Sequence, residues 1–261
     1  MNYKGNLPLT IFLFLHLALF SIWALSLAYR LSFTQGPPEF SLNNDRDAFE
    51  ILANNMKALS NSDLQSVIGS NEIKSDSIEG QLINAGNNHI VNLAKITKEY
   101  QDTLEKIGFN QLIYSQDQDF KSKEKLTSVK YITKKAYEAA DVFKTDFYDL
   151  FDIYEKSIKE IEISEALKND YLDRLSKTKD QSKFERFFEI QYEAIALVDE
   201  YLSFLNIALI EISDEGIYIF SDDEDIAEYD NYNNKLSQLT AEEAMILQEN
   251  KNIYSKVSEG L

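Results

Sequence analysis

Apolar residues recur at alternating intervals of three and four along most of the chain. The pattern is clearest over four stretches, at about 79–107, 121–163, 181–212 and 221–257. Intervals of three and four place side chains on one face of a helix and are typical of helices packed along their length. We therefore predict an all-α fold whose four long helices form an elongated antiparallel bundle.

The apolar stripes also predict which side chains face the interior. The 79–107 helix turns inward Leu82, Ala85, His89, Leu93, Ile96, Tyr100, Thr103 and Ile107. The 121–163 helix turns inward Val129, Ile132, Ala136, Ala140, Phe143, Phe147, Leu150, Tyr154, Ile158 and Ile161. The 181–212 helix turns inward Phe184, Phe188, Gln191, Ile195, Val198, Leu202, Leu205, Leu209 and Ile212.

Shorter elements and helix ends follow from local signals. We expect a helix from Asp45 to about Leu59, one turn at 64–68 inside a polar loop, and a short amphipathic helix at 166–176. Gly108 is placed to end the first long helix, since glycine readily adopts the conformation that closes a helix. Ser221, followed by acidic residues, predicts the start of the last helix.

Two short segments break the helical pattern. Phe109–Tyr114 follows the first long helix, and Ile217–Phe220, which is β-branched and aromatic, follows the third. An up-down bundle brings both points to the same end. We therefore expect the segments to pair as a tiny two-stranded sheet that buries Ile219 over the end of the bundle, with Tyr218 facing outward.

The N-terminal region contains a membrane-spanning candidate, Leu9–Tyr29, inside a charge-free run from Gly5 to Tyr29. About 20 apolar residues suffice for a helix to cross a bilayer. The alternative is a signal peptide cut after Ala28, but the run is longer than a usual signal core. We favour an uncleaved anchor, with Lys4 marking the cytoplasmic side.

These features predict a membrane anchor at 1–31, a linker at 32–44 and a helical bundle domain at 45–261. The expected location is the cytoplasmic (inner) membrane, with a single span, the N-terminus inside and the bulk in the periplasm or outside the cell.

No proline follows Pro38, so long uninterrupted helices are permitted. The chain contains no cysteine, so packing alone must hold an exported domain together.

A formal net charge of −18 argues against nucleic acid as a partner, because nucleic-acid binders need a basic face. One basic strip runs through the first half of the 121–163 helix. It is a solvated face that offsets acidic neighbours or, alternatively, a docking strip for an anionic partner. The strip consists of Lys121, Lys123, Lys125, Lys130, Lys134, Lys135 and Lys144.

The sequence contains no recognisable catalytic motif, and we expect neither an enzyme nor a cofactor. His89 is either a core histidine with a hydrogen-bond partner, which we favour, or a metal ligand. The weak metal candidates are acidic residues on both sides of Gly216, which also fit a solvated helix cap. These candidates are Asp214, Glu215, Asp222 and Asp223.

The expected function is that of a non-enzymatic, membrane-tethered bundle acting through contacts with an unknown protein partner, as an envelope scaffold or accessory subunit. The alternative is a binding module for a small ligand or divalent cation, in the bundle core or at the acidic 214–225 loop.

Overall fold

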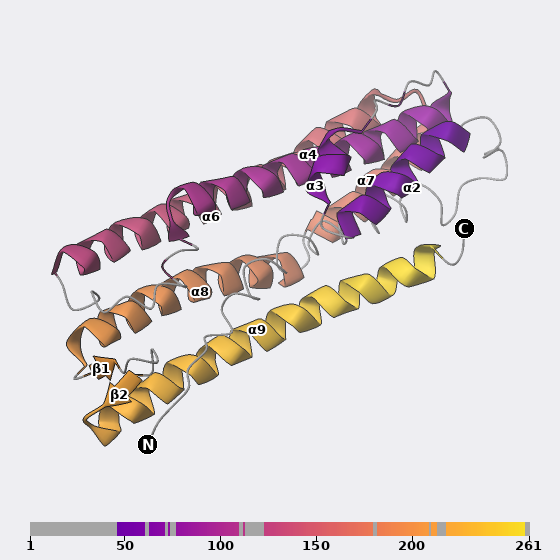
Figure 1. Ribbon diagram of the computed structural model, residues 1–261. Coiled ribbons are helices and arrows are strands. Elements are labelled where there is room, and N and C mark those ends of the chain that lie inside the picture. The colour runs from indigo at the N-terminus through magenta and orange to yellow at the C-terminus, as the bar shows by residue number, and fades with distance from the viewer. Residues whose placement is uncertain are drawn as a thin grey trace. The chain divides into compact units, whose positions relative to one another are not determined.

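The computed structural model describes residues 46–60, 63–70, 73, 77–109, 112, 123–179, 182–208, 210–212 and 218–258 (Figure 1). Over these ranges the chain is mostly helical, as predicted. The helices are α2 (Arg46–Ser60), α3 (Leu64–Ile68), α4 (Ile78–Lys106), α6 (Lys123–Glu160), α7 (Glu165–Lys179), α8 (Ser182–Ile207) and α9 (Asp223–Ser258). The strands are β1 (Ile210–Ile212) and β2 (Tyr218–Phe220).

The segment Leu9–Tyr29, expected to be the anchor, lies outside the described residues. Among the helices that the structure does describe, none combines the length and the apolar character that crossing a membrane requires.

Helix ends follow the local signals with one shift. Gly108 adopts φ 79°, the left-handed conformation expected just beyond α4. The side chain of Asp63 caps α3 by accepting a hydrogen bond from the Ser66 amide at 3.1 Å. At α9 the cap is Asp222 rather than Ser221, because its Oδ1 accepts from the Glu224 amide at 2.8 Å. A carboxylate there also favours the positive N-terminal end of the helix.

The chain packs into two compact units, which we describe separately. The described residues of unit 1 lie in 100–142 and 185–245, and those of unit 2 in 46–99, 143–184 and 246–258. α4, α6, α8 and α9 each contribute residues to both units.

Unit 2 has an aromatic core. The rings of Phe147, Phe151 and Phe184 lie within 5.7 Å of one another, and all three side chains are buried. α2 and α3 bury a second cluster against α4, built around Leu52, Val67 and Ile90. One buried polar contact fixes this packing, since Asn55 donates a hydrogen bond to Asn87 at 2.7 Å.

Unit 1 is built around α8, which buries more than the predicted stripe. The predicted inward residues from Phe188 to Leu205 are buried. A second set is buried as well, and consists of Phe187, Ile190, Ala194, Leu197, Tyr201 and Phe204. α8 is therefore enclosed on more than one side.

On α4 the predicted stripe is wrong at Thr103, which is exposed, while Leu104 beside it is buried.

The predicted sheet partner is wrong. β2 pairs with β1 in antiparallel register, with Glu211 opposite Ile219, and not with Leu112, which is itself helical. Ile212 consequently lies in a strand rather than in the predicted long helix. The physical reason is proximity along the chain, since closing a short loop costs less entropy than joining distant segments.

The expected burial of Ile219 is also wrong, because its side chain is 38 % exposed. Phe220 holds the hairpin instead. Its ring lies 5.1 Å from that of Tyr229 and 6.2 Å from that of Phe204, so it joins β2 to both α9 and α8.

We therefore expect Phe220→Ala to destabilise the protein more than Ile219→Ala. The phenyl ring is half-buried among aromatic partners, and its loss should cost about 1.5–3 kcal/mol. The exposed isoleucine should contribute much less. Urea denaturation followed by far-UV circular dichroism measures both variants. An equal or larger loss for Ile219→Ala would show that this face of the hairpin is covered.

Candidate functional site

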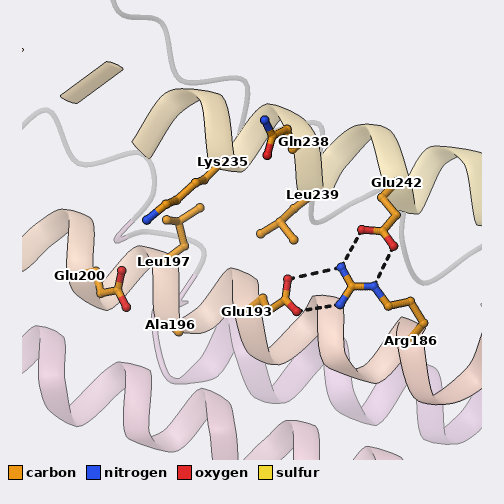
Figure 2. A pocket seen from close by; sticks show the side chains of 9 residues that line it. All are labelled: Arg186, Glu193, Ala196, Leu197, Glu200, Lys235, Gln238, Leu239 and Glu242. Atoms are coloured by element: carbon orange, nitrogen blue, oxygen red, sulfur yellow. Dashed lines mark hydrogen bonds and ion pairs between the residues drawn. The ribbon is translucent and has the colours of Figure 1, made fainter. Parts of the chain in front are cut away.

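A groove of about 330 Å³ lies between α8 and α9 in unit 1 (Figure 2). Its apolar part comes from Ala196 and Leu197 on α8 and from Leu239 on α9. The polar lining residues are Arg186, Glu193, Glu200, Lys235, Gln238 and Glu242.

Heptad spacing explains this lining. Arg186, Glu193 and Glu200 follow one another at intervals of seven along α8, and Lys235 and Glu242 do so along α9. Residues seven apart share one side of a helix, so each row forms one charged edge. The result is an apolar floor, in which Leu197 and Leu239 are largely buried, bordered by charges of both signs.

One end of the groove is closed by Arg186 (Figure 2). Its guanidinium donates to Glu242 through Nε at 2.7 Å and Nη2 at 2.6 Å, and to Glu193 through Nη1 at 2.6 Å. Glu242 and then Glu193 raise the pKa of Arg186 further above its ordinary value, and Arg186 holds the pKa of Glu242 below its usual range. This paired geometry links α8 to α9.

We expect the link between Arg186 and Glu242 to be worth about 1 kcal/mol, because the geometry is bidentate but both groups remain partly in solvent. A double-mutant cycle with Arg186→Gln and Glu242→Gln isolates this coupling. The coupling should shrink at high salt. A value near zero at low salt would show that the two helices are held by apolar contacts alone.

The other end of the groove presents Glu200 and Lys235. Both side chains are exposed, and Lys235 Nζ lies 5.7 Å from the centre of the Tyr232 ring. Glu200 and Lys235 therefore remain accessible to a charged or polar ligand, whereas Arg186 is fully engaged.

α6 packs against α8 through polar contacts on one of its sides. Thr133 donates to Asp199 at 3.0 Å, and the Tyr192 hydroxyl donates to Asp141 at 2.6 Å. The rings of Tyr137 and Tyr192 stack with centres 6.1 Å apart. Burial and then the bond to Asp141 raise the pKa of Tyr192, so its hydroxyl stays protonated and donating at neutral pH.

The basic strip of α6 lies partly within the described side chains. Lys130 and Lys134 are exposed, and Lys135 pairs with Glu138. The same helix exposes three large apolar side chains, Tyr131 at 61 % and Val142 at 59 % in unit 1, and Ile153 at 53 % in unit 2.

His89 is buried in unit 2, as predicted. Its ring lies 5.3 Å from that of Tyr154 and 5.6 Å from that of Phe151. The predicted hydrogen bond is not formed with good geometry by either ring nitrogen of His89. The backbone of Leu150 lies close enough to raise the pKa of the ring slightly. Burial lowers the pKa of His89 to about 4, so the imidazole is neutral at pH 7.

The structure describes two of the four acidic metal candidates. Asp222 and Asp223 are exposed at the start of α9, where Asp222 serves as the cap. Asp214 and Glu215 lie outside the described residues. Across the part of the chain that the structure describes, no three His, Cys, Asp or Glu side chains gather in an arrangement that could hold a metal ion.

The sequence analysis did not identify the groove or the three exposed apolar residues of α6. The spacing of Arg186, Glu193 and Glu200 was a usable signal for the groove, because it continues over two heptads. Comparison with known proteins adds no further guide: no protein-family model, curated protein or solved structure matches the chain.

Proposed function

We propose that this chain is a non-enzymatic, membrane-tethered helical protein that acts outside the cytoplasm through contacts with other protein chains. The observation that carries the proposal is the pair of exposed apolar side chains on the part of α6 that belongs to unit 1, Tyr131 and Val142. The groove between α8 and α9 offers a second surface for such contacts.

Isolated exposed apolar residues are common on soluble proteins and need no explanation. Tyr131 and Val142, however, are separated by eleven residues, which is about three turns, and so lie on one face of α6. Lys135 and Glu138 occupy the turns between them and pair with each other. This alternation of apolar and charged groups supports a role in protein contact.

The contact role is tested by placing a photo-crosslinking amino acid at Val142 and, as a control, at the exposed Lys106 of the same unit. After irradiation of intact membranes, we expect discrete protein adducts from position 142 and few from position 106. Equal yields from both positions would show that α6 has no preferred partner.

The tether rests on the length and apolar character of Leu9–Tyr29. We expect protein purified from membranes to retain Met1–Ala28, which intact-mass spectrometry can determine. A mature mass starting at Tyr29, together with recovery in the soluble fraction, would remove the tether from the proposal.

A further inference from the structure

We propose that unit 2 binds one ordered water molecule between α4 and α6, held by the side chains of His89 and Tyr154. The site lies wholly within unit 2, since His89 belongs to its 46–99 range and Tyr154 to its 143–184 range. The inference does not depend on the proposed function, because it concerns the interior of the unit and not a contact with another chain.

Both side chains place polar atoms where bulk water does not reach them. His89 is 5 % exposed and Tyr154 is 3 % exposed. Neither ring nitrogen of His89 nor the Tyr154 hydroxyl has a hydrogen-bond partner among the described residues. An unpaired polar atom in a protein interior lowers stability, and most buried polar atoms in proteins are paired. The core of unit 2 therefore calls for a further polar group at this point.

The two side chains are neighbours that do not bond directly. Their ring centres lie 5.3 Å apart, with the planes tilted by 46°. Polar groups that lie near each other without the geometry of a direct hydrogen bond are commonly joined by a water. A neutral imidazole has one donor and one acceptor, and so does a phenol, so one direct bond would leave a donor and an acceptor unpaired. A water molecule can donate to or accept from either group.

The backbone of Leu150 provides a third partner. It lies close enough to His89 to raise the pKa of the ring. Leu150 precedes Tyr154 by four positions, so both lie on the same face of α6. A backbone carbonyl has two lone pairs, and a helical hydrogen bond uses only one of them. Buried waters typically make about three hydrogen bonds, which the imidazole, the hydroxyl and the Leu150 carbonyl supply.

The surroundings favour a small uncharged ligand over an ion. The ring of Phe151 lies 5.6 Å from that of His89, and Phe147 and Phe184 are buried in the same core. An ion would lose its hydration in this aromatic environment, which is costly unless charged or polar ligands replace it. Within the described ranges, no three His, Cys, Asp or Glu side chains gather to replace it.

The bound water joins α4 to α6 through directional contacts. Aromatic packing alone tolerates small shifts of one helix along the other, whereas a fully paired polar network specifies one arrangement. The water therefore helps to fix the register of α4 against α6 inside unit 2.

The test counts long-lived waters by magnetic relaxation dispersion of water oxygen, using the full chain in detergent micelles. Tyr154→Phe removes only the hydroxyl and should lower the dispersion amplitude by the contribution of one water. Tyr192→Phe is the matched control: its hydroxyl donates directly to Asp141 at 2.6 Å, so the same chemical change should leave the amplitude unaltered. An amplitude that Tyr154→Phe does not lower would overturn the inference.

Two substitutions test His89 in the same way. His89→Leu should release the same water, whereas His89→Gln keeps a donor and an acceptor and should retain it. Tyr154→Phe preserves the ring and decides the question if His89→Leu does not fold.

Urea denaturation then shows whether the two residues share one molecule. The midpoint of the double variant His89→Leu, Tyr154→Phe should shift about as far as that of the more affected single variant, because either substitution alone already removes the water. Fully additive shifts would contradict a shared water. Non-additive shifts with an unchanged dispersion amplitude would indicate a direct hydrogen bond between the residues and would also remove the water.

Discussion

Replacing Phe147 by alanine should lower the free energy of unfolding by about 3–5 kcal/mol, the range typical for removing a buried phenyl ring. The side chain is fully buried in unit 2 and lies edge-on to two other buried rings, 4.9 Å from Phe184 and 5.3 Å from Phe151. The substitution therefore removes both apolar burial and aromatic contacts, and leaves a cavity in the core of unit 2.

The matched control is Ile153→Ala on the same helix. Ile153 is 53 % exposed, so its loss should change the free energy of unfolding by less than about 0.5 kcal/mol. Urea titration followed by circular dichroism measures both variants. If Phe147→Ala cost no more than the control, the aromatic core of unit 2 would not be the main source of its stability.

Acidification should destabilise the protein through His89. The ordinary pKa of histidine is 6.5, and burial lowers that of His89 to about 4. Between these values the unfolded chain binds a proton that the folded chain does not, so stability is fully present above pH 6.5 and falls as the pH decreases toward 4. At pH 5 this difference amounts to about 2 kcal/mol relative to pH 7.

His89→Leu isolates this contribution. The carboxylates of the chain titrate in both proteins, so the difference in stability between them, measured from pH 7 to 4.5, reports the histidine. The variant should lose less stability on acidification than the parent. Identical losses would mean that the ring is protonated in the folded state and has a partner that stabilises the charge.

The long helices could be predicted because their apolar spacing is regular and no proline interrupts them. On α6 the prediction extends to individual side chains, since Val129, Phe143 and Ile158 are buried as the pattern requires. The end of α4 was predictable for a different reason: Gly108 occupies a backbone conformation that other residues avoid.

The sequence was less informative where a choice depends on tertiary packing. A stripe indicates one apolar face, but α8 also carries Phe187, Ile190 and Phe204 on another side, and only the fold shows that both are covered. The strand partner of Tyr218–Phe220 was misassigned because an inferred bundle topology was given more weight than loop length. The spacing of Arg186, Glu193 and Glu200 indicates one charged edge of the groove, but the width of the groove depends on the separation of α8 and α9, which no local pattern specifies.

The order of the segments has a practical consequence for dissecting the molecule. Unit 1 takes residues from both sides of 143–184, which belong to unit 2, and unit 2 takes residues from both sides of 100–142. No single cut of the chain therefore releases either unit whole. On the ribosome, the early part of unit 1 must wait for residues 185–245 before its core can close. A contiguous fragment ending at Val142 or starting at Glu185 holds only part of each core. The two units must therefore be expressed together, as one chain.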